Sequence, residues 1–105
     1  MNKISLPILA FGCLVLAAGA ALADGKIGAG KAKSEDCADC HGPDGTGDGD
    51  TIPSIAGMPA EKFTQAIADF RSGKRSGSKM MTKMGQRLSV EDVADLAAYY
   101  ASLKP

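Results

Sequence analysis

Apolar residues recur with a helical period in two parts of the chain. The first part is residues 59–72, where one face carries apolar residues at the i, i+3, i+4, i+7 spacing: Phe63, Ala66, Ile67 and Phe70. Pro59 stands near the start of this segment, where a proline fits because its missing N–H would have no helical partner. The pattern predicts a helix over 59–72.

The C-terminal segment shows the same period more clearly. Its apolar positions are Val93, Leu96, Ala97, Tyr100 and Leu103. Ser89 precedes them and Asp92 follows three residues later, which resembles a capping box, where two side chains bond free N–H groups of the first turn. We expect a helix that begins at Ser89 and buries this apolar stripe.

The other segments are less regular. Residues 25–39 are expected to form a first helix that runs into the sequence 37–41. Residues 42–57 contain glycine and proline without a helical period, which is typical of a loop. Residues 73–86 are basic and rich in methionine, and are expected to form a loop that includes at most a short helix. Because no segment alternates apolar and polar residues, the sequence predicts an all-α fold.

The N-terminus has the three-part layout of a secretory signal peptide. Lys3 supplies a positive charge, residues 6–22 are uncharged and mostly apolar, and residues 21–23 include the small side chains that a cleavage site requires. The alternative is a retained membrane anchor, since the apolar run approaches the ~20 residues that span a bilayer. We expect cleavage to remove residues 1–23 and leave 24–105 as one periplasmic domain without a membrane span.

A domain of this size usually requires a source of stability beyond its core. After cleavage only Cys37 and Cys40 remain, and a disulfide between them would close too short a loop to organise the chain. The chain has no Trp, and its 12 basic and 12 acidic residues balance, so its charge does not indicate nucleic-acid binding. The composition favours a domain that folds around a large apolar group.

Cys37, Cys40 and His41 form the sequence C-x-x-C-H, the pattern of covalent c-type haem attachment. Two thiols one helical turn apart can reach the two vinyl groups on one porphyrin edge, and the adjacent histidine can offer a nitrogen to the iron. A thioredoxin-like site should instead follow a strand, a structural zinc site requires four ligands, and a simple disulfide leaves the histidine unexplained. The motif therefore predicts one covalent haem c.

The second axial ligand must be another residue type, because His41 is the sole histidine. Methionine suits an electron-transfer cytochrome, since a Met/His pair raises the reduction potential. Met80, Met81 and Met84 all lie in the polar, basic segment before the last helix. Any one of them could instead fill the core. The residues alone leave the choice among the three open.

Five stretches of the chain resemble class I bacterial cytochromes c: residues 30–33, 37–45, 53–57, 70–73 and 88–100. The nearest pattern is one half of the periplasmic di-haem cytochromes, and of the cytochrome subunits of sulfide-oxidising flavoproteins. The single C-x-x-C-H excludes a di-haem chain. The resemblance implies the small class I fold, with three to five helices around one covalent haem c.

The resemblance also implies which residues lie around the iron. In this family the axial methionine lies eight residues before the serine that opens the last helix, which is Met81, with Met84 and Met80 as alternatives. Pro53 matches a proline whose carbonyl oxygen accepts a hydrogen bond from the axial histidine and orients its ring.

The same family pattern implies how the haem is enclosed. Gly30 matches a glycine that lets the last helix cross closely, with Tyr99 packed onto it. Ile55, Leu96 and Tyr100 are expected to contact the haem, although Leu96 and Tyr100 could also be ordinary core residues.

The charges are segregated along the chain. All charged side chains in residues 71–87 are basic, and all charged side chains in residues 34–50 are acidic. A charged run is often no more than a solvated surface. The functional interpretation is that the basic segment, beside an exposed haem edge, steers the protein toward an acidic redox partner, because weak redox interfaces gain association rate from complementary charge.

The first functional hypothesis is a periplasmic electron carrier, not an enzyme, whose His/Met-ligated haem c passes single electrons between redox partners. The second is an electron-accepting cytochrome subunit of a flavoprotein dehydrogenase, for instance one that oxidises sulfide. The third is a haem-based sensor or small-ligand-binding protein, which requires that no methionine binds the iron.

Overall fold

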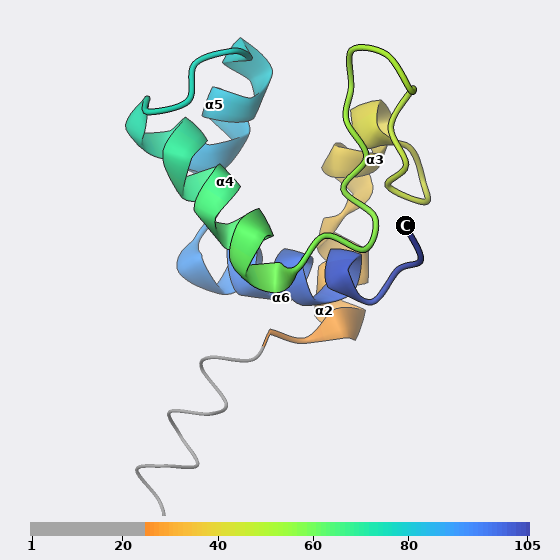
Figure 1. Ribbon diagram of the computed structural model, residues 1–105. Helices are drawn as coiled ribbons and strands as arrows, with labels where there is room; N and C mark the ends of the chain where they lie inside the picture. The colour runs from red at the N-terminus through yellow and green to blue at the C-terminus, as the bar shows by residue number, and fades with distance from the viewer. Residues whose placement is uncertain (1–24) are drawn as a thin grey trace, which may run out of the picture.

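The computed structural model describes residues 25–105, so the predicted signal peptide, residues 1–23, lies outside the described residues. The helices of this part are α2 (Ile27–Lys33), α3 (Glu35–His41), α4 (Ala60–Ser72), α5 (Lys79–Arg87) and α6 (Val90–Ala101) (Figure 1). Residues 25–105 contain no strand, which confirms the predicted all-α fold. No helix in this range is long and apolar enough to cross a membrane.

Helix α6 is the centre of the fold, because α2 and α4 both pack against it (Figure 1). Its capping box forms as predicted: the Asp92 N–H donates to Ser89 Oγ over 3.0 Å, and the Ser89 N–H donates to Asp92 Oδ2 over 3.1 Å. The expected apolar stripe turns inward, with Leu96 0% and Tyr100 1% exposed. The interior of the domain is therefore built on α6.

Helix α4 confirms the helix predicted over 59–72, although it begins one residue later. It begins at Ala60, and Pro59 is the residue before the helix. The apolar face buries Phe63, Ile67 and Phe70, and α4 packs on both α5 and α6. Helix α4 thereby connects the methionine-bearing helix to the centre of the fold.

The prediction of a single first helix over 25–39 was wrong, because the chain forms two short helices, α2 and α3. The break is at Ser34, whose hydroxyl donates to the Lys31 carbonyl oxygen over 2.7 Å while its N–H bonds to the same oxygen over 3.2 Å. Serine side chains compete in this way with the backbone bonds of a helix. Helix α3 then continues to His41, so the whole C-x-x-C-H motif is helical.

Gly30 allows α2 to cross α6 at close range. A Cβ atom at this position would lie 2.0 Å from the Asp95 carbonyl oxygen and 2.7 Å from Tyr99 Cβ. Real Cβ atoms do not approach other atoms this closely, so a larger residue would force the helices apart. The close crossing that the resemblance implied for Gly30 and Tyr99 is confirmed.

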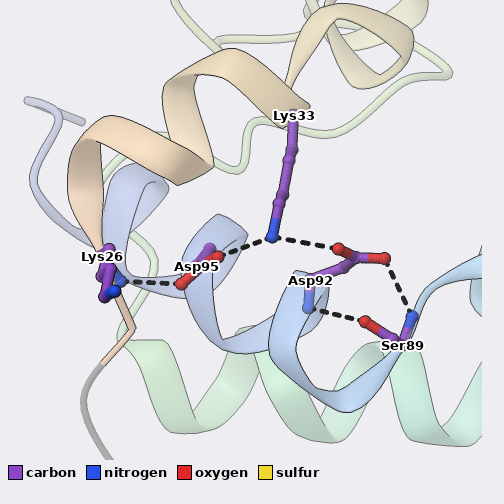
Figure 2. Close-up of polar contacts among 5 residues, drawn as sticks. All are labelled: Lys26, Lys33, Ser89, Asp92 and Asp95. Atoms are coloured by element: carbon purple, nitrogen blue, oxygen red, sulfur yellow. Dashed lines mark hydrogen bonds and ion pairs between the residues drawn. The ribbon is translucent and has the colours of Figure 1, made fainter. Parts of the chain in front are cut away.

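The α2–α6 crossing is also held by a polar cluster around Asp95, a 4% exposed residue of α6 (Figure 2). Asp95 Oδ1 accepts the Lys26 N–H over 2.8 Å, and its Oδ2 accepts from Lys33 Nζ over 2.6 Å. Lys33 also lies 3.0 Å from Asp92 Oδ1. The Lys33 hydrogen bond, followed by that of Lys26, holds the pKa of Asp95 below its usual range. Apart from the residue types, no pattern in the sequence indicated this cluster.

Residues 79–87 form a nine-residue helix, α5, where the sequence indicated a loop with at most a short helix. Ser78 supplies the N-cap, since its Oγ accepts the Met81 N–H over 3.2 Å. Gly85 is buried against α4, where a Cβ would lie 3.1 Å from the Ile67 carbonyl oxygen. The close approach to α4 accounts for a glycine inside α5, where Gly85 is the residue that favours a helix least.

Residues 42–57 form the predicted loop, which folds back onto α6. Gly45 has φ +73° and its carbonyl oxygen accepts the N–H groups of Ile55, over 2.7 Å, and Ala56, over 3.0 Å. A Cβ on Gly45 would lie 2.9 Å from Tyr100 Cε1. Glycine is therefore required here both for the backbone conformation and for the contact with α6.

Candidate functional site

Helix α3 carries both cysteines and the histidine of the predicted site. Cys37 is partly buried and packs against the hydrophobic core, whereas Cys40 is exposed, and both thiols are free. His41, the last residue of α3, is 8% exposed. Because the two thiols are three residues apart on a helix, they lie on the same side of α3 about one turn apart.

The His41 ring is oriented by the loop that follows it. Its Nδ1 lies 2.9 Å from the Pro53 carbonyl oxygen, which is the contact that the resemblance implied. Since a carbonyl oxygen can only accept, this contact requires the proton on Nδ1. The Nε2 lone pair is then available to a metal, because it is not used by this hydrogen bond.

A continuous apolar wall lies beside these groups. Ile55, Leu96 and Tyr100 all belong to the buried core cluster, against which Cys37 and Met81 also pack. The Tyr100 ring stacks on Phe63, with ring centroids 5.7 Å apart. Burial raises the pKa of the Tyr100 hydroxyl and of the Cys37 thiol. The wall therefore favours uncharged groups.

The three candidate methionines of α5 differ in their surroundings. Met81 is partly buried and packs against the core cluster. Met80 is 58% exposed. Met84 is partly buried, and its sulfur accepts a hydrogen bond from Arg87 Nη2 over 2.9 Å. The structure thus brings Met81 and Cys37, from α5 and α3, onto the same core cluster.

Arg87 and Asp36 are site residues that the sequence analysis did not identify. Arg87 Nη2 lies 3.7 Å from Asp36 Oδ2, which connects the last residue of α5 to the residue before Cys37. The i, i+3 spacing of Met84 and Arg87 could have suggested the contact between the guanidinium and the sulfur. The ion pair with Asp36 required the tertiary structure.

An open apolar groove elsewhere on the protein does not coincide with the site. It lies between α2, α4 and α6 and is lined by residues that include Ile27, Ala60, Val90 and Ala98. None of the predicted site residues lines it. The predicted site residues instead lie on α3, α5, α6 and the 42–57 loop.

The chemistry of these groups fits a covalently attached haem. Cys37 and Cys40 are free thiols at the required spacing, the hydrogen bond to Pro53 leaves His41 Nε2 available, and Met81 offers a thioether beside the same apolar wall. Within residues 25–105 no group of three or more His, Cys, Asp or Glu side chains is arranged to hold a metal ion. The donor set is that of an iron held in a porphyrin.

Comparisons with known proteins also indicate a protein with covalently attached haem. The family described as "Cytochrome c" matches residues 17–104. The "Cytochrome c-554(548)" of Halomonas halodenitrificans is 42% identical over 80 residues, which cover 74% of this chain and 96% of that protein. The "Cytochrome c4" of Pseudomonas aeruginosa is 38% identical over 105 residues, which cover 99% of this chain and 50% of that protein.

Further similarities extend to an enzyme subunit and to a solved structure. The "Cytochrome subunit of sulfide dehydrogenase" of Chlorobaculum tepidum is 35% identical over 74 residues, 70% of this chain and 66% of that protein. The cytochrome c4 structure of Acidithiobacillus ferrooxidans has a TM-score of 0.70 and 29% identity over 76% of this chain and 51% of that one. The chain thus spans about half the length of the cytochromes c4, but nearly all of the cytochrome c-554(548).

Proposed function

Because the chain belongs to the cytochrome c family, we propose that it is a periplasmic carrier that passes single electrons between redox partners on one covalent haem c. One observation carries the proposal: the C-x-x-C-H helix and Met81 pack against the same apolar wall, with Nε2 of His41 available. This arrangement would allow covalent attachment of a haem and supply two donors to its iron.

Each residue of the site has a separate task. Cys37 and Cys40 would hold the haem covalently through their thiols, and His41 and Met81 would offer a nitrogen and a sulfur to its iron. When bound, the haem supplies reversible one-electron chemistry of its iron. The Pro53 carbonyl keeps the imidazole in the required orientation and tautomer, as partners of a metal-bound histidine do.

The apolar wall has a second task, which is to keep water from the iron. Leu96 and Tyr100 are at most 1% exposed and Ile55 is 9% exposed, so the wall is dry in the folded chain. A dry surrounding favours the less charged, reduced iron and limits solvent rearrangement on electron transfer.

The charged surfaces support docking to an acidic partner. The basic residues of 71–87 are all exposed: Arg71, Lys74, Arg75, Lys79, Lys83 and Arg87. Arg71 lies in the last turn of α4, Lys74 and Arg75 follow it, and Lys79, Lys83 and Arg87 lie on α5 with the methionines, whereas α3 and the following loop carry exposed acidic residues. Figure 1 shows α5 and α3 on different sides of the protein above α6. We infer that a partner with an acidic surface docks on the basic side.

The location of the protein follows from its first residues. A basic start, the apolar stretch 6–22 and the small residues 21–23 support export and cleavage after Ala23. Mass spectrometry of the purified periplasmic protein tests this proposal, with Asp24 as the expected first residue. A chain that retains residues 1–23 in the membrane fraction would contradict it.

The alternative is an electron-accepting cytochrome subunit of a flavoprotein dehydrogenase. The similarity to the cytochrome subunit of the Chlorobaculum tepidum sulfide dehydrogenase favours this alternative. Purification under gentle conditions separates the two functions. A stable complex with a flavoprotein would support the subunit role, and an isolated cytochrome supports the carrier role.

Optical spectroscopy tests the proposed function directly. The purified protein should contain one c-type haem per chain by the pyridine haemochrome assay, and its oxidised spectrum should show the weak long-wavelength band of sulfur-to-iron charge transfer. Met81→Ala should remove this band, whereas Met80→Ala, at an exposed position, should keep it. A covalent haem without the band that binds CO would favour a sensor, and a protein without covalent haem would overturn the proposal.

A further inference from the structure

We propose that Arg87 is a positioning residue that holds the Met84 sulfur away from the iron and so makes Met81 the axial ligand. This inference rests on the proposed function, because it requires a haem with a methionine ligand. It answers a question that the sequence leaves open, since α5 offers several thioethers within residues 80–84.

Burial alone separates only one of the three methionines. Met80 is 58% exposed, whereas Met81 and Met84 are both partly buried. Three residues of helix place Met84 about 60° around and about 4.5 Å along the axis from Met81. The long, unbranched methionine side chain can cover a displacement of this size. Met84 is therefore a competing ligand unless another contact restrains it.

Arg87 provides that restraint. Its Nη2 donates to the Met84 sulfur over 2.9 Å, so this hydrogen bond must break before the sulfur can move toward another partner. The Arg87 side chain is 64% exposed, so the contact ties the Met84 sulfur to a solvent-exposed group. Among the described residues no such contact engages the sulfur of Met81, which packs against the same core cluster as Cys37.

Asp36 is a second partner of the arginine. Its Oδ2 lies 3.7 Å from the same Nη2, and its side chain is 70% exposed. An exposed pair at this distance contributes little free energy, so Asp36 adds only a weak bias to the orientation of the guanidinium. Because Asp36 directly precedes Cys37, the contact places Arg87 relative to the attachment helix as well as to α5.

The rest of α5 does not depend on Arg87. The Ser78 cap holds the first turn, and Gly85 holds the middle of the helix against α4. Removing the arginine should therefore free the Met84 side chain without unfolding α5. The substitution should therefore change which methionine binds the iron and leave the haem content unchanged.

The decisive experiment compares three proteins by the sulfur-to-iron band. Met81→Ala should lack the band, because Arg87 still holds Met84. The double variant Met81→Ala with Arg87→Leu should regain it, because Met84 is then free to bind. A third change, Met84→Leu, should abolish the band again. Failure of the double variant to regain the band, in a protein that retains its haem and helical circular dichroism, would overturn the proposal.

A second measurement serves if the double variant does not fold. The reduced wild-type protein should show one iron-bound methionine methyl resonance by NMR, Arg87→Leu should show two, and Arg87→Leu with Met84→Leu should show one. Lys83→Leu is the matched control, since it removes a positive charge from the same helix without a contact to Met84, and should show one. A single unchanged resonance in Arg87→Leu contradicts the role of Arg87.

The same spectra separate the two proposals. If wild-type protein lacks the band, or Met81→Ala keeps it, then Met81 is not the ligand, and both the ligand assignment and the role of Arg87 are wrong. If Met81→Ala lacks the band, but adding Arg87→Leu leaves the spectra of the wild type and of Met81→Ala unchanged, the proposed function stands. The inference on Arg87 is then wrong.

Discussion

Lys33 and Asp95 form an ion pair of 2.6 Å between residues that are 62 positions apart in the chain. Figure 2 shows the pair joining α2 to α6. The close crossing at Gly30 joins the same two helices, and α2 leads directly into the attachment helix. The position of Cys37, Cys40 and His41 relative to the core therefore depends on a contact between the two ends of the domain.

Replacement of Asp95 with Asn should make the protein less stable at neutral pH and less sensitive to acid. The pKa of Asp95 is lowered by Lys33, so the ion pair stabilises the fold above the ordinary Asp pKa of about 3.9 and this stability is lost as the pH falls through the lower, folded pKa. Urea unfolding between neutral pH and about pH 3 measures the effect. As the pH is lowered, the urea midpoint of the wild-type protein should fall more steeply than that of Asp95→Asn. Equal slopes of midpoint against pH would argue against a stabilising ion pair. Glu91→Gln, an exposed position on the same helix, is the control.

Gly30→Ala should destabilise the domain although alanine favours helices. Its Cβ would lie 2.0 Å from the Asp95 carbonyl oxygen, so α2 and α6 must separate. Gly28 provides the control on the same helix, since a Cβ there meets nothing within 4 Å. Gly28→Ala should raise the unfolding free energy by about 0.5–1 kcal/mol, while Gly30→Ala lowers it. Effects of the same sign in denaturant titrations would show that the crossing tolerates a methyl group.

Leu96→Ala should cost about 2–5 kcal/mol of unfolding free energy, because it removes a 0% exposed side chain from the core. Val90→Ala, at an 82% exposed position of α6, should change it by no more than about 0.5 kcal/mol. Chemical unfolding of the haem-containing protein measures both. A loss for Leu96→Ala as small as that for Val90→Ala would mean that the side chain is not packed as described.

Charge reversal at Lys83 should change electron-transfer rates according to the charge of the reaction partner. Oxidation of the reduced protein by anionic ferricyanide should be slower in Lys83→Glu at low ionic strength, and oxidation by cationic tris(phenanthroline)cobalt(III) should be faster, because the side chain is exposed on α5. Both differences should fade as salt is added. Lys104→Glu, exposed near the C-terminus, is the control. Equal changes in the two variants would place the reactive surface elsewhere.

Features that depend on neighbouring residues could be predicted from the amino-acid sequence. The apolar period and the Ser89 capping box specify α6, and the spacing of Cys37, Cys40 and His41 indicates haem attachment, because all of these are set by positions within one or two helical turns. The resemblance to class I cytochromes c added the long-range contacts of Gly30 and Pro53, which the structure contains.

Features that depend on contacts between distant segments required the folded structure. The break at Ser34 divides a segment whose pattern reads as one helix, and the packing of Gly85 on α4 stabilises a helix in a segment whose composition indicates a loop. The different surroundings of Met81 and Met84 follow from the same kind of contact, because the core cluster lies beside one and Arg87, paired with Asp36 of α3, binds the other. Local patterns carry no information on such contacts, since the partners come together only when the helices pack.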